Sequence, residues 1–521
     1  MKRSKIYLVL LLLPLMVACF SDETTDAINP LSTIVVESGI ESVYNIGKND
    51  QIVIEPVISQ KNKEKPLRYT WEVNLENKDS AATFTFVGQS LGKYNCRFIV
   101  ENEDGKTFVP FTINVNSPYE EGITVLSKDA NGKSMLSFMQ KPYGNEKGEF
   151  YNYDCFAVNN PDYDFAAGAV DLVQCRDFSG NGSWVIIACQ GGGEDNDPPT
   201  IYYLNEKTFE VENFVSVPEY EDFKPVKMGL QPTVYKQTSY PILCENGKVY
   251  DFSIGEADVV EARKLQSTYA QSCVLTNSAT GYEILLYDKA NKGLSLIYNG
   301  YGPYYCSKKK YHLILGDENF KKYNYYSGCD LVAMTNIRMT KEDYAKSGNR
   351  SRILVITSYQ AGLFATSEVL YADFWGYDGT ETEDEKKYPV DIQNTHDGDW
   401  DSERCLLTPE TPCIANMTYH TLFFADGNKV RVWDYEDAKS SDLEGLLNAG
   451  VFCEVGSADA IVTGFEMSDD HKKTYVAFYE PKKEGLNGSV WVFDTDSKDG
   501  KPLEKYDNIS YQPVKMIYKK K

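Results

Sequence analysis

Residues that could carry catalysis are few and scattered in this sequence. A zinc enzyme gathers two or three histidines in one site, and a hydrolase triad needs one beside its nucleophile. The chain has no G-x-S-x-G, H-E-x-x-H or G-x-G-x-x-G motif, and Ser127 stands where a phosphate loop ending in Gly132-Lys133-Ser134 would need glycine. Its histidines are His312, His396, His420 and His471. We predict that each is a surface or hydrogen-bonded core residue and that the chain is not an enzyme.

Two acidic segments, residues 190–199 and 376–403, are the candidate metal-binding stretches. Calcium takes six to eight oxygen ligands, mainly carboxylates and carbonyls. Asp397, Asp399 and Asp401 alternate like ligands of a calcium loop, but the sixth position of that loop is Ser402 rather than glycine. We therefore expect a solvated loop, with calcium as the open alternative. The 76 acidic residues offer many carboxylate pairs for glycoside hydrolysis, and no specific pair stands out.

The positive signal is aromatic. The chain has 38 tyrosines, and residues 301–326 place several of them between lysines. Tyrosine offers a large, rigid contact area with a polar tip, which suits recognition surfaces. The alternative is that β-strands are naturally rich in aromatic residues. The candidate residues for binding a ligand or partner are Tyr301, Tyr304, Tyr305, Tyr325 and Tyr326.

Composition and charge narrow the class of protein. Hydrophobic residues make up 42% and charged residues 25%, as in packed globular proteins. The formal charge is −23, an acidic excess that disfavours binding to nucleic acid. The cysteines are widely spaced and form no C-x-x-C pair, and many stand in apolar contexts. We expect mostly buried thiols that act as small hydrophobic residues, and disulfide pairing stays open.

The N-terminus has the pattern of an export signal. A basic head is followed by 13 mostly apolar residues from Ile6 to Ala18, too few for the roughly 20 that cross a bilayer. The run Leu15-Met16-Val17-Ala18-Cys19 resembles a bacterial lipoprotein lipobox. That resemblance implies that the signal peptide, 1–18, is cleaved and that Cys19 carries the lipid. The alternative is an ordinary signal peptide with an incidental cysteine.

Residues 19–30 are polar and acidic and are predicted to form a flexible tether. Ser21-Asp22-Glu23 resembles the short export signal of surface lipoproteins in Bacteroidetes. This implies an outer-membrane protein that faces the cell exterior and contacts the membrane only through its lipid. The alternative is a solvated linker that carries no export signal.

Residues 31–117 are predicted to form an antiparallel β-sandwich. Short runs alternate apolar and polar residues between turn-rich spacers: 32–37, 51–59, 67–74, 82–88, 94–102 and 108–116. The segments 69–73, 92–106 and 111–115 resemble the PKD-like repeat, an immunoglobulin-like sandwich that commonly acts as a spacer. The resemblance places Trp71 at that family's core tryptophan. It places Tyr94 at the tyrosine that follows the family's glycine. The family's usual Asp-x-x-Gly turn is shifted in this sequence, and Glu103-Asp104-Gly105 takes its place.

Residues 118–521 show recurring hairpins and little helical periodicity. Paired apolar runs flank Gly/Asn/Asp/Lys turns at 200–214, 240–254, 283–299, 420–436 and 473–497. The junction at 117–140 resembles PKD-like lipoproteins that accompany SusC/SusD-type importers, which implies a β-propeller here. Seven blades of about 58 residues fit once long loops are counted, against a usual repeat of about 40–50. Eight blades or two stacked sandwiches are the alternatives.

The sequence therefore predicts an all-β chain in which a sandwich precedes a propeller. That resemblance implies a non-catalytic accessory or ligand-binding subunit of a TonB-dependent SusC/SusD-type importer of oligopeptides or glycans, partnered by the importer and neighbouring lipoproteins. It implies no cofactor. The rival hypotheses are a surface hydrolase with a carboxylate site in the propeller channel, and a capture protein for a cobamide or iron chelate.

Overall fold

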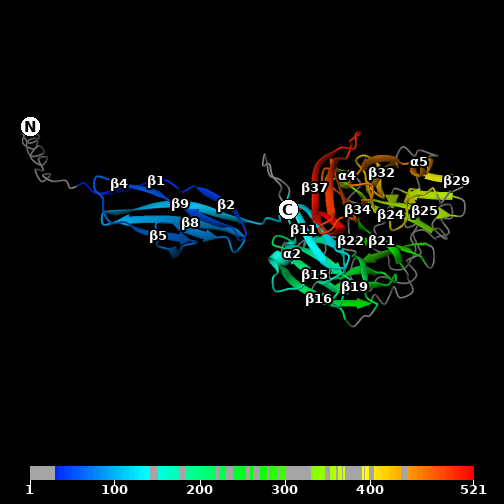
Figure 1. Ribbon diagram of the computed structural model, residues 1–521, viewed down its shortest axis with the longest axis horizontal. Helices are drawn as coiled ribbons and strands as arrows, with labels where there is room; N and C mark the ends of the chain where they lie inside the picture. Colours follow the sequence, from blue (N-terminus) through cyan, green and yellow to red (C-terminus); the bar gives the residue numbers. More distant parts are fainter. Residues whose placement is uncertain are drawn as a thin grey trace, which may run out of the picture. The chain divides into compact units, whose positions relative to one another are not determined.

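The computed structural model confirms the all-β class. It describes residues 30–140, 151–176, 183–218, 222–228, 239–253, 258–261, 270–278, 281–289, 293–299, 330–346, 352–359, 362–366, 368–369, 390–391, 394–397, 404–435 and 443–520. Helices in these ranges are short: α2 (Cys155–Asn159), α4 (Lys341–Lys346) and α5 (Leu443–Leu447). None of the described helices is long and apolar enough to cross a membrane. The chain divides into two compact units, residues 1–118 and 119–521 (Figure 1).

The first unit contains a five-stranded sheet in the order β2-β9-β8-β5-β6 and two strand pairs, β1–β4 and β3–β7. Its strands are β1 (Thr33–Ser38), β2 (Val43–Gly47), β3 (Gln51–Ile54), β4 (Val57–Lys61), β5 (Arg68–Val73), β6 (Glu76–Asp79), β7 (Phe84–Val87), β8 (Gly92–Asn102) and β9 (Gly105–Asn116). Every pairing is antiparallel except that of β2 with β9. All six alternating runs therefore form strands, as predicted.

One buried core holds the first unit together. Trp71 is fully buried at its centre, as expected, with Phe98, Ile113 and Val100 around it. In β8, Cys96, Phe98 and Val100 are buried and the residues between them are only partly buried. This alternation is the reason that the strand could be predicted from the sequence. Tyr94 packs against the core and its hydroxyl donates to the Ser90 carbonyl oxygen at 2.8 Å.

The second unit is built from antiparallel meanders. The sheet orders are β12-β11-β10-β38, β13-β14-β15-β16, β17-β18-β19-β20, β21-β22-β23, β29-β26-β25-β24-β30-β31-β32-β33 and β34-β35-β36-β37, with a further pair, β27–β28. The eight-stranded sheet joins two four-stranded meanders through a short parallel pairing of β24 with β30.

These strands have the following bounds: β10 (Gly122–Lys128), β11 (Ser134–Gln140), β12 (Tyr151–Asn152), β13 (Ala169–Arg176), β14 (Ser183–Cys189), β15 (Thr200–Asn205), β16 (Val211–Ser216), β17 (Pro225–Met228), β18 (Ser239–Cys244), β19 (Val249–Ser253), β20 (Asp258–Glu261), β21 (Ala270–Ser278), β22 (Gly281–Asp288), β23 (Gly293–Asn299), β24 (Asp330–Arg338), β25 (Arg352–Tyr359), β26 (Gly362–Thr366), β27 (Glu368–Val369), β28 (Val390–Asp391), β29 (Asn394–Asp397), β30 (Cys413–Asn416), β31 (Thr421–Asp426), β32 (Lys429–Asp434), β33 (Gly450–Glu454), β34 (Ile461–Met467), β35 (Lys473–Tyr479), β36 (Gly488–Asp494), β37 (Pro502–Ser510) and β38 (Gln512–Lys519). All five predicted hairpins are present.

Neighbouring sheets of this unit bury apolar faces against each other. In β14, Val185 and Ile187 join one core with β10 and β11, whereas Ile186 and Ala188 join another with β18 and β19. Both faces are covered at the central strands β14 and β15, so these two strands are almost continuously buried and do not alternate. Contacts run on from β13 to β17, β18 to β21, β21 to β24, β24 to β30 and β30 to β34.

The two ends of the second unit lie in one sheet. The last strand, β38, pairs antiparallel with β10 and also contacts β13 and β34. The ammonium of Lys519, a residue with 1% exposure, donates to the main-chain carbonyls of Tyr119 and Glu120, the latter at 2.9 Å. The C-terminal strand is therefore bonded to the segment that opens the unit.

Candidate functional site

The residues that sequence reasoning selected for function lie almost entirely outside the described part. The residues that lie outside the described ranges are Cys19, Tyr301, Tyr304, Tyr305, Tyr325 and Tyr326. The expected solvated loop around Asp397 needs correction, because Asp397 ends strand β29 and pairs with Gly362 of β26. Main-chain pairing with β26 therefore replaces a loop at this point. Asp399 and Asp401 lie outside the described residues.

The other acidic segment forms a tight turn. Gly191, Gly192 and Gly193 have positive φ angles of 78°, 88° and 73°, which glycine adopts at little cost. The Asp197 carboxylate accepts a hydrogen bond from the Ala167 main-chain N–H at 2.9 Å. Within the described ranges, no group of three histidine, cysteine or acidic side chains is arranged to hold a metal ion.

His471 is a hydrogen-bonded core residue, as predicted. It is 3% exposed, and its Nδ1 lies 2.8 Å from the Thr418 hydroxyl, which is itself 3.5 Å from an Asp343 carboxylate oxygen. Burial lowers the pKa of His471. Threonine is the middle member here, whereas in a hydrolase triad histidine stands between nucleophile and acid. The contact between Thr418 and His471 links the turn between β30 and β31 to the turn between β34 and β35.

The eight cysteines whose side chains the structure describes form no disulfide bonds, in line with the expectation of small hydrophobic residues. Six are buried (Cys96, Cys155, Cys175, Cys189, Cys244 and Cys453), and Cys405 and Cys413 are partly buried. Burial raises the pKa of Cys189 and of Cys453 to about 12. A thiol with so high a pKa is a poor nucleophile.

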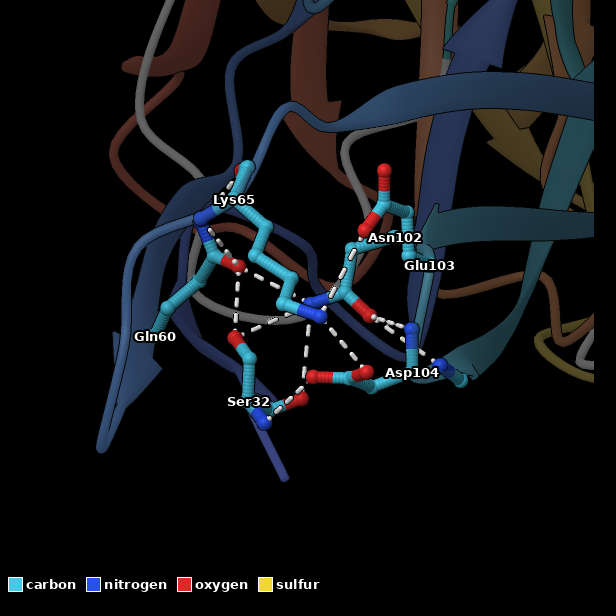
Figure 2. A network of polar contacts seen from close by, with 7 residues as sticks. Ser32, Gln60, Lys65, Asn102, Glu103 and Asp104 are labelled. Atoms are coloured by element: carbon cyan, nitrogen blue, oxygen red, sulfur yellow. Dashed lines mark hydrogen bonds and ion pairs between the residues drawn. The ribbon is translucent and has the colours of Figure 1, made fainter. Parts of the chain in front are cut away.

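A polar network closes one end of the first unit (Figure 2). Asn102 donates to the side chains of Ser32 and Gln60 at 3.0 and 2.9 Å, and its own side-chain oxygen accepts from the main-chain N–H groups of Asp104 and Gly105. Lys65 pairs with Asp104 at 2.6 Å. The predicted Glu103-Asp104-Gly105 turn is thus organised by Asn102, and the network ties the start of β1 to it.

A groove in the second unit is the best candidate for ligand binding. It is lined by residues of the sheets β12-β11-β10-β38 and β34-β35-β36-β37, whose strands β11 and β37 are in contact (Figure 1). Its volume is about 420 Å³, within the range of small-molecule sites. Ile123 and Met139 line its base and belong to the apolar core shared by the two sheets.

Three tyrosines line the groove from three different strands. Tyr475 comes from β35, Tyr506 from β37 and Tyr518 from β38. The rings of Tyr475 and Tyr518 lie 6.1 Å apart at 42°. The Tyr518 hydroxyl donates to Glu121 at 2.5 Å and the Tyr506 hydroxyl to Glu504 at 2.7 Å. These bonds orient two of the rings before any ligand arrives.

Charged groups surround the tyrosines. Lys473 pairs with Glu504 at 2.8 Å, and Lys520 pairs with Asp469 at 2.6 Å. Burial alone would raise the pKa of Glu504, but hydrogen bonds from Lys473 and Tyr506 outweigh it and lower that pKa. Burial, and after it Glu121, raises the pKa of Tyr518 well above its usual range. The groove can therefore accept hydrogen bonds through carboxylates and stack a ligand on aromatic rings.

Sequence reasoning missed this groove because no local signal marks it. Tyr475, Tyr506 and Tyr518 are far apart in the chain and stand in ordinary strands. Glu121 joins them only because β38 pairs with β10. A prediction that the first and last strands share a sheet would have placed Glu121 near Tyr518.

Comparisons with known proteins leave the family open. The chain matches no protein-family model and none of the curated proteins. Among solved structures, a quinonprotein alcohol dehydrogenase-like protein from Bacteroides thetaiotaomicron matches with 13% identity and a TM-score of 0.46, over 94% of this chain and 99% of that chain.

Two further solved structures match more weakly. The computationally designed Ika8 protein has 9% identity and a TM-score of 0.31, over 76% of this chain and 89% of its own. Saccharomyces cerevisiae Sqt1 has 9% identity and a TM-score of 0.36, over 77% and 88% respectively. With TM-scores below 0.5, none of these similarities assigns a family to the chain.

Proposed function

We propose that this chain is a surface-exposed outer-membrane lipoprotein, anchored through Cys19, that serves as a non-catalytic accessory or ligand-binding subunit of a TonB-dependent SusC/SusD-type importer of oligopeptides or glycans. The observation that carries the proposal is one chain in which a lipobox and an acidic tether precede two compact all-β units. Such a chain places a binding unit outside the membrane at the end of a spacer.

The first unit is, in this proposal, an immunoglobulin-like PKD-like sandwich that acts as the spacer. Its support is the five-stranded sheet around fully buried Trp71, together with the sequence segments that resemble the repeat. The polar network of Asn102, Lys65 and Asp104 holds the start of β1, which directly follows the tether. That network would bear a pull transmitted from the lipid.

The second unit is proposed to be a seven-bladed propeller. Seven groups of strands support this: the five separate meanders and the two joined by β24 and β30. Each group contacts the next along the chain, mostly through first strands and at one step from β18 to β21, and β38 pairs with β10 of the first group and contacts β34 of the last. Radial repetition of this kind leaves only short, protected sheet edges. The groove beside β38 then lies between the first and last blades.

Two experiments on cells test the function. Replacing Cys19 by alanine should abolish metabolic labelling with a lipid probe and release the protein from the membrane, and external protease should degrade the wild-type protein on intact cells. Deleting the gene should reduce uptake of the importer's cargo. Unchanged uptake, or a protein that is protected from protease on intact cells, would contradict the proposal.

A further inference from the structure

The groove has walls that come from both ends of the second unit. Glu121, Gly122 and Ile123 lie at the start of the unit's first strand, and Tyr518 lies in its last strand, β38. Hydrogen bonds between β10 and β38 hold these residues together. The opposite wall is formed by β35, β37 and the turn at 468–472. The cavity is therefore part of the fold and not a gap between loops.

Aromatic faces are the first feature that selects a ligand. Tyr475 packs on the core with Ile123 and Met139 and shows part of its surface to the groove. Within the described part of the chain its hydroxyl makes no hydrogen bond, unlike those of Tyr506 and Tyr518. An aromatic face attracts cations through its quadrupole, and a free hydroxyl can donate to an acceptor on the ligand.

Charge is the second feature. Four carboxylates line the groove, Glu121, Asp469, Asp470 and Glu504. Glu504 pairs with Lys473, Asp469 pairs with Lys520, and Asp470 lies 4.0 Å from Lys472. Glu121 instead accepts the hydrogen bond of the neutral Tyr518 hydroxyl. Burial raises the pKa of Tyr475 well above its usual range, and after burial the carboxylates of Glu504, Asp470, Glu466 and Glu121 raise it further. These carboxylates therefore place negative charge near the Tyr475 hydroxyl. The chain's net charge of −23 also attracts cations toward its surface.

From this geometry we infer that the groove binds a cationic nitrogen group, an ammonium or guanidinium, seated against Tyr475 and Tyr518 with Glu121 as its counter-charge. A lysine or arginine side chain of a peptide and a free polyamine share this chemistry. A peptide also offers a carbonyl oxygen to the Tyr475 hydroxyl. The inference deepens the proposed ligand-binding role by assigning a ligand class to one place on the chain.

Direct binding measurements on the purified protein test this inference. The probes are acetyl-Gly-Arg-Gly-amide, acetyl-Gly-Lys-Gly-amide and spermidine, with acetyl-Gly-Leu-Gly-amide and maltohexaose as neutral comparisons, each titrated by calorimetry at low and high salt. The basic probes should bind, the neutral ones should not, and salt should weaken binding. Stronger binding of the peptides than of spermidine assigns the cation to a peptide, and the reverse order assigns it to a polyamine.

Variants locate the binding. Glu121→Gln keeps an acceptor for the Tyr518 hydroxyl while removing the charge, and Tyr475→Leu removes the aromatic ring. Each should weaken binding of the basic probes about tenfold or more. The matched controls are Glu454→Gln and Tyr163→Leu, which change exposed residues outside the groove and should leave affinity unchanged. Thermal unfolding of each variant checks that it is folded.

The outcomes separate this inference from the proposed function. Loss of basic-probe binding in both groove variants, with unchanged controls, supports a cation site. No binding of basic probes, basic-probe binding unaffected by the groove variants, or maltohexaose binding that the groove variants abolish would overturn it. None of these outcomes affects the association with an importer, which is measured separately on native complexes.

Discussion

The burial of Trp71 leads to a sharp stability prediction for the first unit. Its ring is fully buried and lies 5.0 Å from that of Phe84, 4.2 Å from Phe98 and 6.0 Å from Phe111. The indole N–H donates to the Ala81 carbonyl oxygen at 2.9 Å. Replacing tryptophan by alanine in such a core costs about 3–5 kcal/mol. Trp71→Phe removes the donor and part of the ring, and we expect a cost of about 2 kcal/mol.

These costs are large for a unit of this size. A domain of roughly 90 residues has an unfolding free energy of about 4–13 kcal/mol. Each kcal/mol shifts the midpoint of a domain this small by about 4–8 °C, so Trp71→Ala should lower it by at least about 12 °C. The first unit has its own core, so its transition should move while that of residues 119–521 stays in place.

Differential scanning calorimetry of the full chain provides the assay. The control is Phe108→Ala, which truncates a side chain in the same sheet that is 52% exposed, and which should cost less than about 1 kcal/mol. A Trp71→Ala variant as stable as Phe108→Ala would refute the placement of Trp71 at the centre of the core.

Three further predictions concern individual groups. Lys519→Met removes the donor to the first segment of the second unit and should lower its unfolding free energy by about 2 kcal/mol, measured with urea. The Lys65 hydrogen bond lowers the pKa of Asp104, so Asp104 stabilises the first unit above its unfolded pKa of about 3.9, and acid unfolding below that pH should flatten in Asp104→Asn. Burial raises the pKa of Cys189 to about 12, so at pH 8 its alkylation should be roughly a thousandfold slower than in the unfolded chain, as followed by mass spectrometry.

Each of these predictions has a contrary result. Lys519→Met should be less stable than Lys498→Met, which changes an exposed lysine. Equal stability of the two variants would show that the hydrogen bonds of Lys519 to the Tyr119 and Glu120 carbonyls do not stabilise the second unit. If the stability of Asp104→Asn falls with decreasing pH as steeply as that of the wild type, the ion pair of Lys65 with Asp104 does not stabilise the folded first unit. Rapid alkylation of Cys189 in the native protein would show that its thiol is accessible.

Strand positions could be predicted wherever the physical signal is local. The alternation in β8 records one buried face, and the turns of the five hairpins carry glycine, asparagine, aspartate or lysine. Strand β6 (Glu76–Asp79) was not expected because all four residues are polar and exposed. It forms because Asn74 and Leu75 adopt positive φ angles of 50° and 71° and turn the chain back onto β5.

The groove could not be predicted because its parts meet only after long-range pairing. The Lys519 ammonium reaches the carbonyl of Tyr119 across 400 positions of sequence. Tyr475 and Glu121 approach each other only through the packing of two sheets. The sequence prediction instead chose the tyrosines at 301–326, because tyrosine is frequent there. A high local count of one residue type does not show which side chains meet in the folded protein.

Purification of the native protein from its own membranes tests the central claim most directly. A tagged chain, solubilised in mild detergent, should carry lipid on Cys19 as its first residue and should co-purify with an outer-membrane barrel and its lid lipoprotein. A Cys19→Ala chain should recover neither. Recovery of the wild-type chain without lipid and without a barrel partner would contradict the account.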